Sequence, residues 1–504
     1  MKTTKPLFVG MYETKRLGIR YLSSALKKHG YDTNLIFLKD FNSYAVDEPT
    51  DAEYHLFCQL IEELNPGYIG FSIMSSFYLE VVKKLATLLR QHTNVPIIVG
   101  GAYVSLFPEK CLEFSDVAFR GECEEAIVEF TDALENGQPF EHLDNLCTNG
   151  PDGPRINEVR LLKHNLDSIP HPDFGGDHMY YINNDKIMQG DPAVKTHSYE
   201  LTTSRGCPNR CSYCSTGSIR DLYKGKGPFI RQRSIQDVMQ ELEDVKQKNP
   251  GLQVLRFWDE IFPWNKEWVA EFARQYKAKI NLPFEVWGHP KLSANKECLE
   301  HMVAAGLSKI VIGVQSGCPK TRKDIYTRNE TQGDILNCSN SLAAAKVPLV
   351  IYDFILGHPF ETPEDLRETL ELCRKLAKPF LLQLHGLSFL PGTPIEEIAV
   401  RHGVKTWDEI RAEQARPLRE QYHSMAWWRQ GHGAGGNKEK VYWYTLIYLT
   451  QFPSGERIIR WALKNEALKK NPSKLLLLHK IYNLRVKFQM GSRKLRFMLR
   501  NKLR

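Results

Sequence analysis

The sequence lacks a long apolar segment. Nowhere among its 504 residues do 18 or more consecutive apolar residues occur, although apolar types make up 42% of the chain. A membrane-spanning helix needs about 20 such residues, so a transmembrane helix of the usual kind is excluded. The first residues, MKTTKPLFVGMYE, also lack the apolar core and cleavage site of a secretory signal. We therefore expect a cytoplasmic protein with two or three folded domains.

A regular set of paired cysteines is also missing. The 11 cysteines are scattered and odd in number, which disfavours a disulfide framework. Six of them are expected to be ordinary buried residues, namely Cys58, Cys111, Cys147, Cys298, Cys338 and Cys373. Three others, Cys207, Cys211 and Cys214, lie within SRGCPNRCSYCSTGS at the spacing C-x₃-C-x₂-C, with no fourth cysteine nearby.

Three thiols on one short loop favour a particular kind of metal site. A structural zinc site uses four protein ligands, commonly from two C-x₂-C pairs, and no second pair follows here. A [4Fe–4S] cluster bound by three cysteines leaves one iron open for an external chelating ligand. The spacing therefore favours an iron–sulfur cluster, with zinc and three unrelated buried cysteines as the alternatives.

The first 140 residues alternate between strand and helix patterns. Strands are predicted at 6–12, 32–38, 68–74 and 96–103, and helices at 17–30, 54–67, 77–92 and 123–137, the last of them opened by VAFRGE. This alternation predicts a parallel sheet in a doubly wound α/β fold, whose ligands bind beyond the carboxyl ends of the strands. Ser72, Ser76, Gly100 and Gly101 are expected at that edge.

The rest of the chain divides into three parts. Residues 141–196 are rich in Asn, Asp, Gly, Pro and His and are predicted to be a surface linker. From 197 to 395 the alternation resumes, with strands predicted at 198–207, 252–260, 284–290, 309–317, 348–359 and 380–392. A partial or full α/β barrel follows, with Asp259, Gln315, Gly357 and His385 near its mouth. Residues 396–504 are predicted to be mostly helical, and include Trp427-Trp428 and GHGAGG.

Charge is distributed unevenly along the chain. Residues 438–504 contain 17 Lys and Arg against three Glu, a net charge of +14, whereas the rest carries −6. This asymmetry indicates an anionic partner for the tail, or else a solvated basic end on helices that pack against the barrel. A membrane surface is one candidate, because apolar and aromatic residues are mixed with the basic ones. Nucleic acid is less favoured, because no recognised binding motif accompanies the charge.

The cysteine segment and the strands after it resemble the radical SAM superfamily. RGCPNRCSYC resembles the superfamily's cluster motif, and RFWDEIF, GVQSGCPKTRKDIYTRN, DFILGHPFETPEDLRETL and SFLPGTP resemble later segments of its barrel. The resemblance covers about residues 197–395. It implies that Cys207, Cys211 and Cys214 bind a [4Fe–4S] cluster and that S-adenosylmethionine (SAM) binds the fourth iron. Reductive cleavage of SAM would then give a 5′-deoxyadenosyl radical.

The same resemblance implies further site residues. Tyr213, Gln315 and Ile355 match positions that contact SAM in relatives. Asp259 and Glu260 are weaker candidates, because paired acids at a strand end also cap helices. His289, His358 and His385 are mouth candidates, although a lone histidine is more often an ordinary polar residue. Arg231 and Arg233 are candidates for holding a carboxylate, the alternative being a solvated loop.

The first domain resembles the cobalamin-binding class of this superfamily. The match lies in LGIRYLSSALKKHGYDTNLI and in IIVGGAYVSLFPEKCLEFSDVAFRGECEEAIVEF. It implies that cobalamin contacts Ser72, Ser76, Gly100, Gly101 and Glu122. Tyr103 stands where relatives have histidine, and the D-x-H-x-x-G segment that supplies a lower cobalt ligand is absent. A domain that has lost its cobalamin remains an alternative.

The resemblance implies a cobalamin-dependent C-methyltransferase acting on an unactivated carbon. Three alternatives stay open: a radical rearrangement or cyclisation without cobalamin, an RNA-modifying enzyme, and a non-catalytic iron–sulfur sensor. The expected partners are a small molecule, of the lipid, isoprenoid or tetrapyrrole kind if the tail contacts a membrane, and an electron donor of the flavodoxin or ferredoxin type.

Overall fold

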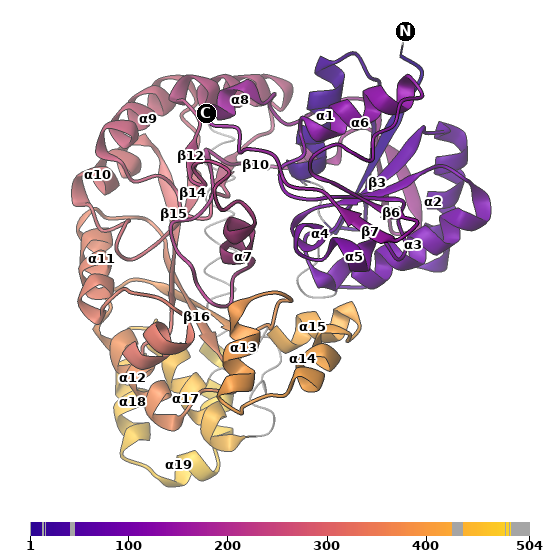
Figure 1. Ribbon diagram of the computed structural model, residues 1–504. Coiled ribbons are helices and arrows are strands. Elements are labelled where there is room, and N and C mark those ends of the chain that lie inside the picture. Colours follow the sequence, from indigo (N-terminus) through magenta and orange to yellow (C-terminus); the bar gives the residue numbers. More distant parts are fainter. Residues whose placement is uncertain are drawn as a thin grey trace. The chain divides into compact units, whose positions relative to one another are not determined.

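The computed structural model describes residues 2–12, 15, 17–40, 46–425, 437–478, 480–482 and 484. The chain forms two compact units (Figure 1). Unit 1 comprises residues 1–252, 389–396 and 407–421, and unit 2 comprises residues 253–388, 397–406 and 422–504. Trp427-Trp428, GHGAGG and residues 485–504 lie outside the described residues.

A nine-stranded sheet forms the centre of unit 1, in the order β7-β6-β5-β4-β3-β1-β2-β8-β9. The six inner strands from β5 to β8 run parallel, and β6, β7 and β9 add antiparallel edges. The strand bounds are β1 Pro6–Met11, β2 Asn34–Leu38, β3 Tyr68–Ser72, β4 Ile97–Gly100, β5 Val117–Phe119, β6 Leu146–Gly150, β7 Gly153–Ile156, β8 Met179–Asn183 and β9 Lys186–Gln189.

Helices cover both faces of this sheet (Figure 1). Helices α1 (Leu17–Lys28) and α6 (Ala126–Glu135) pack together, as do α2 (Asp51–Leu64) and α3 (Leu79–His92). Edge-to-face contacts of Phe130 with Tyr68 and Phe119 fill the core beneath α6. The doubly wound α/β fold predicted for the first domain is confirmed.

Two local predictions differ from the structure. Residues 141–195, predicted to be a linker, contribute the strands β6 to β9. Tyr103, predicted to lie at the end of a strand, lies instead in the short helix α4 (Ala102–Leu106). The strand ends at Gly100 because Gly101, at φ +115°, turns the backbone into α4. A short helix α5 (Pro108–Cys111) follows.

The cysteine segment also belongs to unit 1. Strand β10 (Ser198–Leu201) leads to the short strand β11 (Ser204–Arg205), and the cysteines fill the connection from β11 to α7 (Ser215–Leu222). Strand β12 (Arg231–Gln232) pairs antiparallel with β11, which places Arg205 opposite Arg231. Helix α8 (Ile235–Lys248) follows its N-cap residue Ser234, whose hydroxyl accepts a hydrogen bond from the Asp237 amide.

Five parallel strands follow in sequential order in unit 2. They are β13 Val254–Phe257, β14 Phe284–Gly288, β15 Leu307–Gln315, β16 Val350–Leu356 and β17 Leu381–Gly386. The helices between them lie along one side of this sheet (Figure 1): α9 Lys266–Lys279, α10 Lys296–Ala305, α11 Gln332–Ala344 and α12 Pro363–Lys375. Aromatic contacts of Phe257 and Phe284 with Phe272 join the sheet to α9. The strands form an open arc of an α/β barrel.

Helices dominate after residue 393, as the sequence predicts. Their bounds are α13 Pro394–Arg401, α14 Trp407–Gln414, α15 Leu418–Met425, α17 Lys438–Leu449, α18 Gly455–Leu463 and α19 Ala467–Lys470. Within the described part of the chain, none of the helices has both the length and the apolar character that crossing a bilayer requires.

Candidate functional site

The cysteine loop begins at a glycine that no other residue could replace without rearrangement. Gly206 adopts φ +92°, and a Cβ atom there would lie 2.3 Å from the Phe229 carbonyl oxygen. The Cys214 amide donates a hydrogen bond to the Cys211 carbonyl at 3.0 Å, and Cys214 is also the residue that caps the start of α7. The backbone therefore forms a tight turn from Cys211 to Cys214, which leads directly into α7.

Burial separates these three cysteines from the other eight. Cys207, Cys211 and Cys214 are half-exposed, whereas the remaining cysteines are buried. Burial raises the pKa of each of those eight thiols, to about 12 at Cys111 and Cys338 and to about 11 at Cys147 and Cys318. Since a cluster ligand must be a thiolate, the buried cysteines are poor ligands and the loop cysteines are the suitable set.

The loop thiols are close in sequence, but their side chains do not converge on one point. Among the described residues, no three His, Cys, Asp or Glu side chains are arranged to hold a metal ion. The agreement with a cluster therefore lies in the donor chemistry, the spacing and the accessibility of the three thiols. Tyr213, predicted to contact SAM, is half-exposed between Ser212 and Cys214.

Ion pairs join the strand before the cysteines to the turn between β5 and α6 of the first domain. Arg205 donates to Glu122 at 2.9 Å and to Glu124 at 2.6 Å, and Arg231 binds both oxygens of Glu122. Burial alone would raise the pKa of Glu122, but the two guanidinium groups outweigh it and hold the pKa below its usual value. The Tyr223 hydroxyl also accepts a hydrogen bond from the Glu122 amide.

This arrangement changes how three predicted residues are understood. Glu122, predicted to contact cobalamin, has both carboxylate oxygens engaged by Arg205 and Arg231. Arg231 therefore does hold a carboxylate, but one from this chain. Arg233 likewise binds Asp237 and Glu241 of α8.

The other predicted cobalamin contacts gather at the carboxyl edge of the first sheet. Ser72 ends β3 and Gly100 ends the adjacent strand β4, and these two residues are paired in the register. Ser76 begins a short 3₁₀ turn, Ser76–Tyr78. A Cβ atom on Gly101 would lie 2.6 Å from the Ile73 carbonyl oxygen, so only glycine fits there.

No histidine follows a strand at this edge. The histidines within residues 9–131 are His29, His55 and His92, and they lie after α1, within α2 and at the end of α3.

The carboxyl edge of the second sheet carries the predicted SAM contacts. Gln315 ends β15 at φ +69°, next to an irregularity in the pairing with β16. Its side chain folds over Gly313, where a Cβ atom would lie 2.8 Å from the Gln315 Nε2 atom. Ile355 of β16 pairs in register with His385 of β17. Asp259 is buried and Glu260 exposed directly after β13.

The three candidate histidines differ in their surroundings. His289 and His358 are buried and lie 3.4 and 3.8 Å from the carboxylates of Glu330 and Glu361, so they belong to the interior of unit 2. His385 is more exposed and lies 4.0 Å from Asp353. Burial raises the pKa of Asp353 to about 7, against the effect of the charge on Lys309.

Sequence reasoning missed an aromatic and charged group on one face of this sheet. Trp258 stacks on Trp287 with ring centroids 4.1 Å apart, and Trp258 is 46% exposed. The Lys309 ammonium lies 5.5 Å from the Trp287 ring and 2.6 Å from Glu285. Only the register that aligns β13, β14 and β15 brings these residues together, and no motif signals it.

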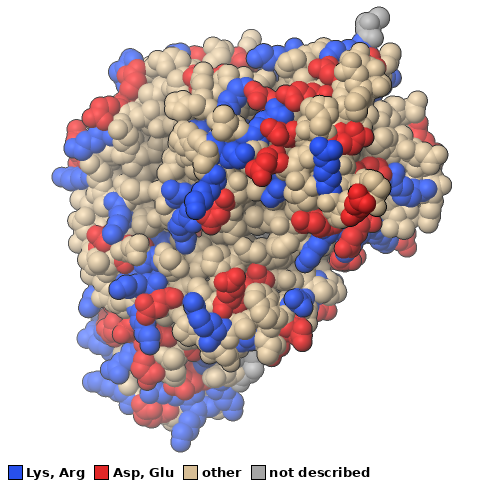
Figure 2. All heavy atoms as spheres, viewed as in Figure 1, with Lys and Arg blue, Asp and Glu red and all other residues tan. Residues whose placement is uncertain are grey.

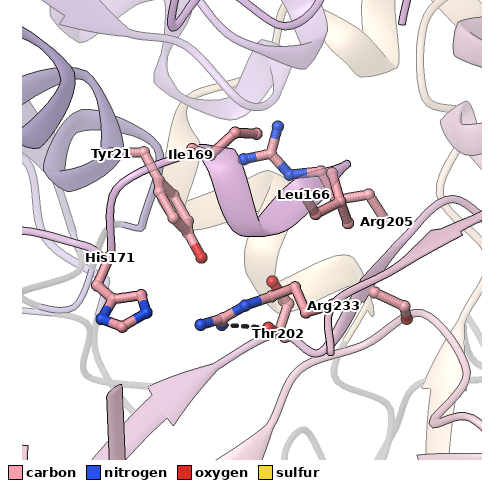
Figure 3. Close-up of a pocket in the computed structure, with 8 residues that line it drawn as sticks. Tyr21, Leu166, Ile169, His171, Thr202, Arg205 and Arg233 are labelled. Carbon is pink, nitrogen blue, oxygen red and sulfur yellow. Dashed lines mark hydrogen bonds between the residues drawn. The ribbon is translucent and has the colours of Figure 1, made fainter. Parts of the chain in front are cut away.

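A cavity in unit 1 lies beside Arg205 and Arg233, two of the arginines that form ion pairs in this unit (Figure 3). Its lining includes Tyr21, His171, Arg205 and Arg233, and Arg233 donates to the Thr202 carbonyl at 3.0 Å. Its volume of about 10 Å³ admits about one water molecule, so it cannot hold a substrate or cofactor.

Comparison with protein families identifies two segments. Residues 201–373 match the model described as the radical SAM superfamily, and residues 9–131 match the B12 binding domain. The first match covers the cysteine loop and β13 to β16, and the second covers the sheet that ends at Ser72 and Gly100.

Curated relatives are about a quarter identical to this chain over the aligned residues. An uncharacterized methyltransferase of Pyrococcus horikoshii is 24% identical over 77% of this chain and 79% of its own length. Cytidylyl-2-hydroxyethylphosphonate methyltransferase of Streptomyces wedmorensis is 24% identical over 62% of this chain and 64% of its own length. The anaerobic magnesium-protoporphyrin IX monomethyl ester cyclase of Cereibacter sphaeroides is 25% identical over 70% and 55%, respectively.

Solved structures share the fold at lower identity. The cobalamin-dependent SAM radical enzyme OxsB, with aqua-cobalamin and SAM bound, superposes with a TM-score of 0.67 at 13% identity, over 97% of this chain and 80% of that one. The radical SAM methyltransferase TsrM from Kitasatospora setae, with cobalamin and a [4Fe–4S] cluster bound, gives a TM-score of 0.61 at 18% identity, over 79% and 75%.

Proposed function

We propose that this chain, which belongs to the radical SAM superfamily and carries a B12-binding domain ahead of its radical SAM domain, is a cobalamin-dependent methyltransferase. The two domains call for a [4Fe–4S] cluster, SAM and cobalamin. When bound, the cluster supplies the electron that cleaves SAM, and cobalamin carries the methyl group. The acceptor is an unactivated carbon of a small molecule, and a flavodoxin- or ferredoxin-type protein supplies the electrons.

One observation carries this proposal. The cysteine loop and the sheet that matches the B12 binding domain belong to one compact unit, and Glu122 joins them through Arg205 and Arg231. Of these groups, the Arg231 side chain is only 2% exposed. A cluster loop tied in this way to the β5–α6 turn of a B12-binding domain suits chemistry that uses both cofactors.

Cofactor content of the reconstituted protein tests the proposal. The full chain is reconstituted anaerobically with iron, sulfide and cobalamin, and then analysed for metal and by absorption spectroscopy. We expect about four irons and one corrinoid per chain, and cleavage of SAM on reduction. If the protein binds iron and cleaves SAM but binds no corrinoid, the radical chemistry still stands and cobalamin-dependent methylation is overturned. Absence of iron would overturn both.

For the substrate, we propose a molecule with an extended apolar or conjugated surface, of the lipid, isoprenoid or tetrapyrrole kind. The stacked pair Trp258–Trp287 supports this, because an exposed indole face next to a second ring suits a flat or extended partner. A tetrapyrrole is favoured among the three, because its flat conjugated ring can stack on the exposed indole face of Trp258.

Quenching of tryptophan fluorescence by protoporphyrin IX tests the tetrapyrrole choice. We expect Trp258→Ala to weaken binding of this probe about tenfold, consistent with the loss of one or two aromatic contacts. Trp407→Ala is the matched control, because Trp407 is 41% exposed and lies in unit 1. Equal binding by the two variants would exclude the tryptophan pair as a tetrapyrrole site.

We also propose that the C-terminal helices contact a membrane surface. Large apolar side chains are exposed on them: Trp461, Leu477, Ile481 and Leu484. Exposed basic residues lie between these, including Arg460, Lys474 and Lys480. Several Lys and Arg side chains gather in Figure 2 at the end of the molecule where Figure 1 labels α18 and α19.

A further inference from the structure

Helix α17 lies outside both family matches, yet nine of its residues in succession are buried. Every residue from Val441 to Leu449 is buried, so this part of the helix is covered around its whole circumference. Such a helix belongs to the interior of a domain. It packs against α12, the helix that directly follows β16 and its turn.

The turn between β16 and α12 is closed by one carboxyl group. Gly357 follows the strand with φ +71°, and its amide lies 3.3 Å from both carboxyl oxygens of Glu361. Glu361 therefore folds back on the first residue beyond β16. Thr362 then caps α12 through a reciprocal bond with Asp365, which fixes where the helix begins.

Two polar side chains of α17 reach this carboxyl group. The Tyr444 hydroxyl donates a short hydrogen bond to Glu361 Oε2, and the Lys440 ammonium lies 3.7 Å from the same oxygen. The Glu361 and Tyr444 positions are 83 residues apart in the chain, so the contact exists only in the folded unit.

Burial makes this contact important for the geometry of the turn. The side chains of Glu361 and His358 are each only 2% exposed. His358 Nδ1 has no hydrogen-bond partner among the described residues, and burial lowers the pKa of His358 to about 3. In such surroundings a lost partner is not replaced by water without rearrangement, so the turn depends on Tyr444.

We propose that Tyr444, with Lys440, is a positioning residue for SAM. These residues hold Glu361, and Glu361 holds the Gly357 turn at the carboxyl end of β16. Ligands of parallel α/β sheets bind beyond these strand ends, and Ile355, a predicted SAM contact, lies two residues before the turn. This inference rests on the proposed function, since it concerns the SAM of that same reaction.

Binding of SAM to the reconstituted full-length protein tests the inference. We expect Tyr444→Phe to weaken SAM binding about tenfold, the loss that follows from one unsatisfied buried group, with iron content unchanged. The matched control is Tyr442→Phe. Tyr442 is also buried, on the same helix, but its hydroxyl donates to the Ala462 carbonyl of α18 at 3.0 Å.

Variants at Glu361 separate positioning from stability. Glu361→Gln keeps an acceptor for the Gly357 amide and should bind SAM nearly as tightly as the wild type, whereas Glu361→Ala should bind it as weakly as Tyr444→Phe. Equal SAM binding by the Tyr444→Phe and Tyr442→Phe proteins would overturn the inference. Failure of the wild type to bind or cleave SAM would instead overturn the proposed function.

Discussion

Glu330 and Glu361, two buried carboxylic acids of unit 2, have opposite pKa shifts because their neighbours differ. Burial alone would raise the pKa of Glu330, but His289 and Arg328 outweigh it and hold this pKa at about 2. Glu361 is equally buried but faces the neutral hydroxyl of Tyr444, with Lys440 only at 3.7 Å. Burial therefore prevails there and raises the pKa of Glu361 to about 7.

The raised pKa of Glu361 predicts how stability depends on pH. Because the folded-state pKa exceeds the ordinary 4.5, the contribution is fully present below pH 4.5 and is lost as pH rises through about 7. Relative to Glu361→Gln, the wild type should lose about 3 kcal/mol of unfolding free energy between about pH 4.5 and about pH 8. The comparison is made by urea denaturation at the two pH values.

The titratable groups facing Glu361 are the same in both proteins, so this difference reports the ionisation of Glu361 in its surroundings. They are His358 of the turn, Asp365 of α12, and Lys440 and Tyr444 of α17. The shifted pKa of Asp353 is likewise common to both. A stability difference that stays constant with pH would show that the pKa of Glu361 is the same in the folded and unfolded chain, so that burial does not raise it.

At the scale of whole elements, hydrophobic periodicity predicted the strands and helices of the first sheet well. β1, β3 and α1 lie within the predicted ranges, because a strand buried on both faces and an amphipathic helix each leave a local pattern. The hairpins between 141 and 195 were missed because turn residues dominate there. Asn184 and Asp185, at φ +53° and +56°, form the two-residue turn from β8 to β9, so the same residues that suggested a linker build a hairpin.

The functional sites were likewise predictable only where they leave a pattern in the local sequence. Cys207, Cys211 and Cys214 form a local motif, and Ser72 and Gly100 follow from strand ends. The Arg205–Glu122 pair spans 83 residues and the Trp258–Trp287 stack depends on the register of two strands. Neither leaves a trace in the local sequence. The domain boundaries and the contacts of Gln315 and Ile355 with SAM remain predictions.

Glu122, Arg205 and Arg231 form a joint between the first domain and the strand before the cysteines. This joint predicts that a substitution at Glu122 lowers both the stability of the fold and the retention of the cluster. Glu122→Gln removes the charge that Arg231 and Arg205 share, and Arg231 is then left buried without its full counter-charge. We expect a loss of about 2 kcal/mol in unfolding free energy, because the Glu122 side chain is 25% exposed and the pair is not fully dry. The iron content that the protein retains through gel filtration should fall together with this stability.

A second ion pair in the same segment provides the control. Arg210 and Asp221 lie 2.8 Å apart, but their side chains are 53% and 59% exposed. Asp221→Asn should leave stability and iron content unchanged, since exposed pairs contribute little. If the two variants behave alike, the joint at Glu122 does not stabilise the cysteine loop.

For the molecule as a whole, charge and exposed apolar surface occur together at the carboxyl-terminal end. In the helical residues described between 473 and 484, Leu477, Ile481 and Leu484 are 62%, 55% and 67% exposed, at the spacing of one helix face. Exposure of such an apolar helix face to water is energetically unfavourable. A lipid surface would accept it, and anionic headgroups would attract the basic side chains around it.

Sedimentation with vesicles tests this contact. The full-length protein should bind vesicles of phosphatidylcholine mixed with phosphatidylglycerol and bind little to phosphatidylcholine alone, and added salt should weaken the binding because the attraction is partly electrostatic. The double substitution Leu477→Asp with Ile481→Asp should abolish vesicle binding.

Leu161→Asp is the control, since Leu161 is 71% exposed but lies in unit 1, before the cysteine segment. Binding that survives the double substitution and depends on salt alone would mean that the positive charge acts without insertion of the apolar face. Absence of binding to either vesicle would assign these helices to a protein partner or to packing within the chain, and it would remove the reason for favouring a membrane-borne substrate.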